Sequence, residues 1–355
     1  MIPLIFEKNE KNFDTLGLGY LPSWIECSVV EERNGAFYLA GELPIDGLHV
    51  DEIAYDRIIL AAPAPQKPAQ PFRIFGIDKG EPDTIKILAY HVSYQLTEAV
   101  NLPLSGGNPP TFSTAQDAIE YIFHYSRPIM EGVFTPVSDI SAGTRVPIDI
   151  KDVVSVRAAI GGTEGGVIDG FGGELEWDFW NVRLHARRGA DTDRKLIYGK
   201  NLESMTFEGS LEGLVTAYAG YVRGEGYTII GSLIDLGNAP FAYPRVETID
   251  LTETFKDADH IPNIQEIDAA TRNAMGGRKE PRASYTTKAV PDDLQDLYLT
   301  DSLMLVYPNI HFDQRVKIVR VVFHPIIEKY TEITVGEIRT SIIDTIAALQ
   351  KGTAL

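Results

Sequence analysis

The chain has 355 residues, a single cysteine and a formal net charge of −18 at pH 7. A chain of this length can bury several cores, so no stabilising metal or cofactor is needed. The charge disfavours functions that depend on attraction to nucleic acid, anionic lipid or anionic cell-wall polymers. The lone Cys27 excludes an intramolecular disulfide and a multi-cysteine zinc site, and its acidic surroundings predict an unreactive thiol.

The amino terminus combines an early proline with mixed charges, which is not the pattern of a signal peptide. Nowhere do about 18 apolar residues follow one another, as a membrane-spanning helix requires. We therefore expect synthesis in a cytoplasm and no membrane insertion.

The first hundred residues are predicted to be rich in β-strands. ECSVVEERNGAFYLAGELPIDG contains two strand-like runs separated by Arg33-Asn34-Gly35, and Asn-Gly favours a hairpin. Further strands are predicted over residues 56–61, 72–77 and 84–92, with a Pro-rich loop, APAPQKPAQP, before the second of them. Residues 1–100 are therefore predicted to form a first β-barrel-like domain.

Residues 101–171 are predicted to form an α/β connecting domain. Ser113 and Gln116 have the spacing of a capping box, which predicts a helix beginning there. One apolar stripe follows, made of Ala115, Ala118, Ile119, Ile122 and Phe123. His124 flanks this stripe and is predicted to be a helix-surface residue. The glycine-rich AAIGGTEGGVIDGFGGELEW lacks the phosphate-binding glycine patterns and is predicted to be a flexible connection.

The stretch WDFWNVRLHARRG, residues 177–189, contains two apolar alternations that are displaced by one residue between Phe179 and Trp180. A one-residue shift exchanges the two faces of a strand, so the chain must bulge or reverse there. This pattern predicts a β-hairpin with its turn at residues 178–181. His185 then lies with Arg183 and Arg187 on the polar face of the second strand, which predicts a solvated strand residue and not a catalytic histidine.

Residues 172–335 are predicted to form a second β-barrel-like domain with an inserted α/β region at about residues 208–290. Strand patterns cover residues 195–207 and 218–230, and a short helix is predicted from Ile264 to Met275, ended by Gly276-Gly277. Residues 318–323 are apolar except for Arg320, which predicts a strand buried on both faces. Residues 336–355 are predicted to form a C-terminal helix. The predicted class is α+β, β-rich and multi-domain.

Catalytic motifs are absent from the sequence, and we predict no catalytic residue, no bound cofactor and no metal site. Glu174 and Glu176 share a strand face as a pair of glycosidase carboxylates would, but strand faces commonly carry such pairs. Asp257-Ala258-Asp259-His260 is the best local metal-like cluster, although adjacent residues seldom all reach one ion. The 16 tyrosines are mostly in strand alternations, which is typical of core or cross-strand partners.

Four strings of the sequence resemble a known family. FGGELEWDFWNVRLHARRGADTDRKLIYGKNLESM resembles a segment of prophage tail proteins of Gram-positive bacteria, in which GGE, an aromatic strand, a double-Arg-Gly and YGKNL follow in this order. RNGAFYLAGELPIDG, PFRIFGIDKG and RVKIVRVVFHPIIEKYTEITVGE resemble an early hairpin, a strand and the closing strands of the same family. The matches extend over about residues 34 to 336. The family is the phage tail-tip hub, also called the prophage endopeptidase tail protein or the amino-terminal region of tail-associated lysin.

The resemblance implies a homotrimer at the end of the tail tube, similar to the central baseplate hub of contractile-tailed phages. Two small β-barrels per chain would give three chains a pseudo-six-fold symmetry. The implied partners are the distal tail protein, the tape-measure protein and receptor-binding proteins, while DNA passes without being specifically bound. The implied location is the tail tip of the virion. The word endopeptidase in the family name implies hydrolysis, which we assign to extensions that this chain lacks.

Three hypotheses follow from the sequence. The first is a structural, non-enzymatic hub whose acidic lumen repels passing DNA. The second is a peptidoglycan endopeptidase, with Glu174, Glu176, Asp257 and His260 as the first candidates for acid, base or metal ligand. The third is a binder of host-surface carbohydrate that uses exposed tyrosines or tryptophans.

Overall fold

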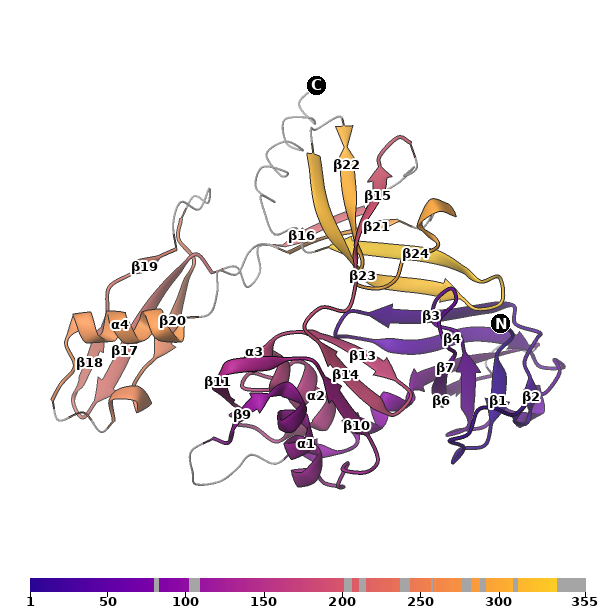
Figure 1. The fold of residues 1–355 in the computed structure, drawn as a ribbon, viewed down its shortest axis with the longest axis horizontal. Coiled ribbons are helices and arrows are strands. Elements are labelled where there is room, and N and C mark those ends of the chain that lie inside the picture. Colours follow the sequence, from indigo (N-terminus) through magenta and orange to yellow (C-terminus); the bar gives the residue numbers. More distant parts are fainter. Residues whose placement is uncertain are drawn as a thin grey trace. The chain divides into compact units, whose positions relative to one another are not determined.

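The chain divides into two compact units, whose elements are labelled in Figure 1. The computed structural model describes residues 1–79, 83–101, 109–200, 206–210, 215–236, 243–256, 258, 260–275, 282–287, 292–308 and 312–336. The first unit comprises Met1–Thr206, Thr286–Val306 and Asp313–Val335, and the second comprises Phe207–Tyr285, Tyr307–Phe312 and Gly336–Leu355.

Strands outnumber helices in the described residues. The strands of the N-terminal half are β1 (Leu4–Phe6), β2 (Gly19–Tyr20), β3 (Glu26–Glu32), β4 (Phe37–Pro44), β5 (Ile58–Ala61), β6 (Gln70–Asp78), β7 (Thr84–His91), β8 (Val100–Asn101), β9 (Thr111–Thr114), β10 (Thr135–Ser138), β11 (Ser141–Pro147) and β12 (Val154–Ser155). The later strands are β13 (Glu174–Asp178), β14 (Asn181–His185), β15 (Asp191–Ile197), β16 (Thr206–Ser210), β17 (Ala217–Gly224), β18 (Tyr227–Ile230), β19 (Ile234–Asp235), β20 (Val246–Asp250), β21 (Arg282–Thr287), β22 (Ser302–Tyr307), β23 (Phe312–His324) and β24 (Lys329–Gly336). The α-helices are α1 (Ala115–Tyr125), α2 (Val156–Gly161), α3 (Val167–Phe171) and α4 (Ile264–Ala274), and the 3₁₀ helices are η1 (Val50–Glu52), η2 (Val92–Thr97), η3 (Glu253–Phe255) and η4 (Asp292–Leu294).

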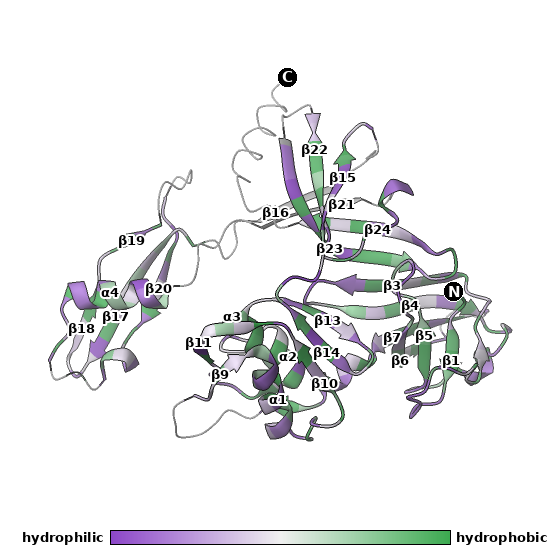
Figure 2. Cartoon of the chain, in the orientation of Figure 1, coloured by the Kyte–Doolittle hydropathy of each residue, from purple (hydrophilic) through white to green (hydrophobic). Residues whose placement is uncertain are grey.

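One large sheet of 13 strands organises the first unit. Nine of its strands follow the order β24-β23-β3-β4-β7-β6-β5-β1-β2, and β22 pairs with both β23 and β15. The Asn-Gly hairpin predicted from the sequence is β3–β4. Along β7 burial alternates from residue to residue, as expected where one face of a sheet is buried, whereas β1 and β5 are hydrophobic (Figure 2) and buried at every residue. The α+β, β-rich class predicted from the sequence is confirmed.

The two predicted barrel-like regions are joined in this sheet. β23, from the C-terminal region, pairs antiparallel with β3, from Arg320 opposite Glu32 to Phe323 opposite Val29. None of the sheets in the described residues closes into a barrel, which corrects that part of the prediction. The physical reason is that β3 and β23, which would each be an edge strand of a separate sheet, satisfy each other's backbone N–H and C=O groups by pairing. The domain boundaries at residues 100, 171, 208, 290 and 335 stay predictions.

The hairpin β13–β14 packs beside the helices of the first unit (Figure 1) and forms a three-stranded sheet with β10. Its turn is Phe179-Trp180, where the sequence pattern shifts. The predicted stripe of α1 is buried and shares a core with the inner face of the hairpin. The capping prediction is wrong by one residue, because the Thr114 side chain, and not that of Ser113, accepts a hydrogen bond from the Asp117 N–H. The inner-face residues of the hairpin are Leu175, Trp177, Val182 and Leu184.

The glycine-rich segment predicted to be a flexible connection instead contains α2 and α3. Ser155 caps α2, and Val156, Ala159 and Ile160 bury one side of it. Residue 165 must be a glycine, because its φ is +74° and a Cβ there would lie 2.3 Å from the Asp149 carbonyl oxygen. The glycines therefore allow close packing of short helices.

Strand β23 differs from its prediction in burial. Ile318, Val321 and Phe323 are buried, whereas Val319, Arg320 and Val322 are only half-buried. Arg320 forms an ion pair with Glu32 at 3.3 Å and another with Glu332. Burial therefore alternates on either side of Val319-Arg320 and does not extend to both faces throughout, because the Arg320 guanidinium must stay accessible to water and carboxylates.

Within its described residues the second unit contains a four-stranded sheet and the α-helix α4. β17 pairs with β18 and β19 antiparallel and with β20 parallel, and α4 packs on β17. The predicted helix is confirmed, with Asn263 and Glu266 forming a capping box. Gly276-Gly277 and the predicted C-terminal helix after Gly336 lie outside the described residues. No helix among those described combines the length and apolar character needed to span a membrane.

Gly220 sets the distance between β17 and α4. A Cβ at Gly220 would lie 2.0 Å from the Thr271 hydroxyl oxygen. We expect Gly220→Ala to push α4 away and to destabilise the second unit by about 1–3 kcal/mol. Hydrogen–deuterium exchange should show faster exchange in β17 and α4. Gly143→Ala in β11, where a Cβ meets no described atom within 4 Å, is the control, and unchanged exchange in α4 of Gly220→Ala would contradict the packing.

Candidate functional site

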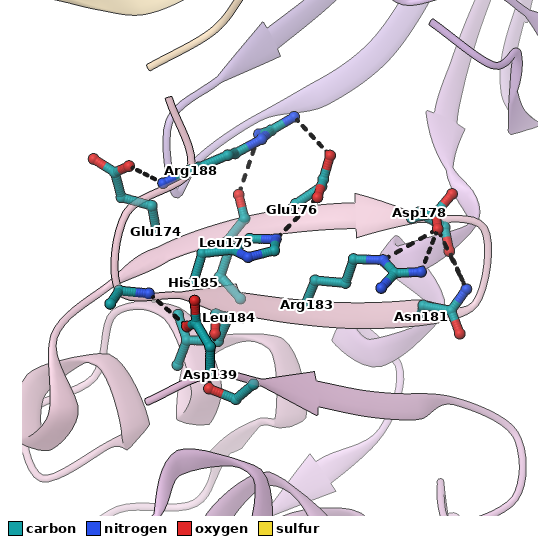
Figure 3. A network of polar contacts seen from close by, with 12 residues as sticks. Asp139, Glu174, Leu175, Glu176, Asp178, Asn181, Arg183, Leu184, His185 and Arg188 are labelled. Atoms are coloured by element: carbon teal, nitrogen blue, oxygen red, sulfur yellow. Dashed lines mark hydrogen bonds and ion pairs between the residues drawn. The ribbon is translucent and has the colours of Figure 1, made fainter. Parts of the chain in front are cut away.

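The hairpin β13–β14 presents a charged face opposite its buried one (Figure 3). Strand alternation places Glu174, Glu176 and Asp178 on this face of β13, and the register places Arg183 and His185 beside them on β14. Asp178 pairs with Arg183 at 3.0 Å and Glu176 pairs with His185 at 3.0 Å. These are diagonal cross-strand pairs, which stabilise a hairpin and fix its register.

His185 is a strand residue, as predicted, but it is not fully solvated. Its side chain is 29% exposed, and its Nε2 atom lies 3.0 Å from a carboxylate oxygen of Glu176. The same Glu176 lies 3.8 Å from Arg188. The histidine therefore belongs to a network of polar contacts that extends from the hairpin to Arg188.

Glu174 is the most buried carboxylate of this network, with only 3% of its side chain exposed. Its Oε1 atom lies 2.7 Å from Lys317 Nζ on β23 and 3.1 Å from Arg33 Nε in the β3–β4 turn. Its Oε2 atom accepts a hydrogen bond from the Arg188 N–H at 2.8 Å. Burial by itself raises the pKa of this carboxyl, but the Lys317 and Arg188 hydrogen bonds and the nearby cations lower it overall.

Arg188 carries the network into the large sheet. Its NH2 group lies 2.7 Å from Glu31 Oε1 on β3, and its NH1 group donates to the Leu175 carbonyl oxygen at 3.2 Å. Burial disfavours the charged guanidinium, but Glu31 and Glu176 outweigh it and raise the pKa of Arg188. The buried guanidinium of Arg188 and the buried carboxylate of Glu31 therefore depend on each other for stability.

A cavity of about 640 Å³ lies over the charged face. Its wall includes Glu176 and Arg183 of the hairpin, Lys67 of the Pro-rich loop, Asp301 and Tyr330. The Tyr330 hydroxyl is buried and has no hydrogen-bond partner in the part of the chain that the structure describes. Burial and the charge of Glu31 raise the pKa of Tyr330. The cavity is lined by charges of both signs. Glu176 and Arg183 are paired within the first unit, Asp301 accepts hydrogen bonds from the Ala190 and Tyr298 N–H groups, and Lys67 lies over the Tyr298 ring.

Asn34 has a second role that the sequence pattern did not reveal. Its φ of +54° suits the predicted turn. Its side chain also accepts a hydrogen bond from the Leu175 N–H at 2.7 Å and donates one to the Gly173 carbonyl oxygen at 3.1 Å. One amide thus joins the first hairpin of the chain to the beginning of β13. An Asn-Gly turn signal contains no information about this distant partner.

The sequence patterns also gave no indication that His91 is a buried residue. Its Nδ1 atom accepts a hydrogen bond from the Ser93 N–H at 3.2 Å, and its Nε2 atom lies 3.3 Å from Gln70 Oε1. Burial and the charge of Arg157 lower its pKa well below the ordinary value, so the ring is neutral at pH 7. His91 is a structural histidine that stacks on Phe37 with ring centres 4.6 Å apart.

The remaining candidates lie apart from one another. Cys27 is fully buried in the core, and burial raises its thiol pKa. His124 is exposed and pairs with Glu131 at 2.7 Å. His260 is exposed and pairs with Glu266 at 3.0 Å, while its neighbours Asp257 and Asp259 lie outside the described residues. Within the described residues no three His, Cys, Asp or Glu side chains are grouped as metal ligands.

The Glu174 network predicts a pH-dependent stability. We expect Glu174→Gln to destabilise the first unit by about 3–5 kcal/mol at pH 7, because Lys317 and Arg33 lose their buried partner. Because the pKa of Glu174 is lower in the folded state than its ordinary value of 4.5, the charged carboxylate stabilises the fold at pH values above 4.5. The difference in the free energy of unfolding between wild type and variant should therefore shrink as the pH falls through the folded-state pKa. Denaturant unfolding of both proteins at several pH values measures this difference.

Glu328→Gln is the control for this measurement, because among the described residues the exposed Glu328 pairs with the terminal amine alone, and a solvated pair contributes little. Equal losses in the two variants, or a Glu174→Gln difference that persists unchanged at low pH, would contradict a dominant role for the buried carboxylate.

No model of a known protein family matches the chain, and no curated protein sequence matches it. Solved structures do match in fold. The prophage tail protein gp18 from Listeria monocytogenes EGD-e covers 100% of this chain and 100% of its own, with a TM-score of 0.56 and 14% identity. A tail protein from Neisseria meningitidis MC58 covers 95% of this chain and 96% of its own, with a TM-score of 0.59 and 10% identity.

A third structure is the 43 kDa tail protein of prophage MuSo2 from Shewanella oneidensis. It covers 95% of this chain and 98% of its own, with a TM-score of 0.60 and 10% identity. At these identities the likeness is one of fold. This chain therefore has the fold of solved prophage tail proteins along nearly its whole length.

Proposed function

We propose that the chain is a structural component of a bacteriophage or prophage tail. The observation that supports this proposal is the fold, which matches the Listeria and Shewanella tail proteins over 95% or more of both chains. The match includes both compact units, so it does not rest on one common small domain.

The hairpin network is consistent with a structural role. Glu174 is held by two cations and Glu176 by His185 and Arg188, so these carboxylates stabilise the fold. A general acid of an endopeptidase needs a raised carboxyl pKa, whereas that of Glu174 is lowered. The geometry at this carboxylate thus favours a scaffold over the endopeptidase hypothesis.

The finer proposal is a trimeric hub at the tail tip, with the distal tail protein, the tape-measure protein and receptor-binding proteins as neighbours. The net charge of −18 supports the part of the proposal that concerns DNA. Three such chains around a tube would place many carboxylates near its lumen, where they would repel passing phosphates. DNA would then pass without adhering to the wall.

Self-association is the first test of the hub. Multi-angle light scattering of the purified chain should give a mass three times that of one chain at micromolar concentration. Because copies of charge −18 repel each other, the trimer fraction should rise as salt increases from about 50 to about 500 mM. A mass of one chain under every condition, or a trimer that dissociates as salt increases, would contradict the proposal.

A further inference from the structure

A second cavity, of about 920 Å³, lies in the first unit beside β6, β7 and η2. Phe75 of β6, Tyr90 of β7 and Tyr94 of η2 contribute its aromatic wall. Strand alternation directs Phe75 and Tyr90 away from the core, because their neighbours Ile74, Ala89 and His91 are buried. This aromatic groove is separate from the cavity over the hairpin.

The aromatic rings form a continuous row, in which Phe75 is tilted by 57° against Tyr90, and Tyr90 is stacked on Tyr94. The ring centres of Phe75 and Tyr90 are 5.1 Å apart, and those of Tyr90 and Tyr94 are 4.5 Å apart with an interplanar angle of 17°. The Arg157 guanidinium lies 4.1 Å from the centre of Tyr94 and 4.4 Å from that of Trp177. Such stacking and cation–π contacts hold the rings in place before any ligand binds.

Arg157 is itself fixed by the fold. It donates to the Ser93 hydroxyl at 2.7 Å and to the Gly35 carbonyl oxygen at 2.9 Å. Burial lowers its pKa to about 10, which still leaves it charged at pH 7. One end of the row is therefore a cation held by hydrogen bonds, while Phe75 is 65% exposed and Tyr90 and Tyr94 are half-buried.

Polar side chains also line the aromatic groove. Asn9, Gln95 and Glu98 line it, and their side chains make no hydrogen bond within the described part of the chain. The charges of Lys8 and Arg73 are matched by those of Asp56 and Glu98. The groove thus combines an exposed ring, uncommitted hydrogen-bonding groups and no excess charge.

We propose that this aromatic groove binds a neutral saccharide. A pyranose has an apolar C–H face that can stack on Phe75, and hydroxyl groups that can bond to the amides of Asn9 and Gln95 and to the carboxylate of Glu98. The balanced local charge fits a neutral sugar, and the net charge of −18 repels anionic polymers. The tryptophans do not contribute an exposed ring, because Trp177 is buried and Trp24 and Trp180 are half-buried.

The test is titration of the full chain with neutral oligosaccharides, followed by isothermal calorimetry. Chitohexaose, cellohexaose, maltohexaose and mannohexaose are the probes. At least one should bind saturably, Phe75→Ala should weaken it about tenfold or more, and Phe75→Trp should retain it. Tyr243→Ala is the matched control, because Tyr243 is similarly exposed at 63% and lies outside the groove.

Two results would overturn the proposal. One is the absence of saturable binding by all four sugars up to about 10 mM, and the other is equal weakening in Phe75→Ala and Tyr243→Ala. If Phe75→Ala instead lowers the mass of an assembled ring while no sugar binds, the groove is a contact between copies of the chain. The proposal does not depend on the tail function, because sugar binding is measured whether or not the chain forms a trimer.

Discussion

The burial of charge beneath the hairpin β13–β14 is the constraint on which the first unit depends. The hairpin is amphipathic, with its apolar face on the helices and its charged face linked to the large sheet by the Arg188–Glu31 and Glu174–Lys317 ion pairs. Carboxylates can be buried only if cations and N–H groups meet them. Arg33, Arg188 and Lys317 supply these groups to Glu174 from widely separated parts of the sequence. The loss of such a pair costs a large share of the roughly 5–15 kcal/mol that stabilises a domain.

This constraint explains why the two β-rich regions share one sheet. The β3–β4 turn contacts the hairpin through Arg33 and Asn34, and β23 contacts it through Lys317. Pairing of β23 with β3 brings these side chains together at the same carboxylate. The first unit is therefore held as one body by backbone pairing and by buried charge. A body of this kind suits a protein that acts through its shape.

Features with a local physical cause were predictable from the sequence. The shift between Phe179 and Trp180 predicted the hairpin turn, and the spacing from Ala115 to Phe123 predicted the buried side of α1. Both depend only on the periods of strand and helix. The capping prediction was wrong by one residue because Ser113 and Thr114 are both good caps, and only the backbone decides between them.

Features that depend on distant partners were not predictable. The pairing of β3 with β23 joins residues almost three hundred positions apart, and no period in either strand indicates it. Glu174 looked like half of a carboxylate pair, but its cations come from residues 33 and 317. The exposure of Phe75 also follows from the tertiary fold, because an alternating strand pattern does not reveal whether the outer face is covered.

Under the proposed function, this polypeptide works by assembling with itself into part of a phage tail. Electron cryo-microscopy of the purified chain tests this proposal most directly. We expect a closed ring of three copies, with the first unit intact in each copy and carboxylates toward the central opening. Isolated single copies, or an open filament without a central opening, would contradict it.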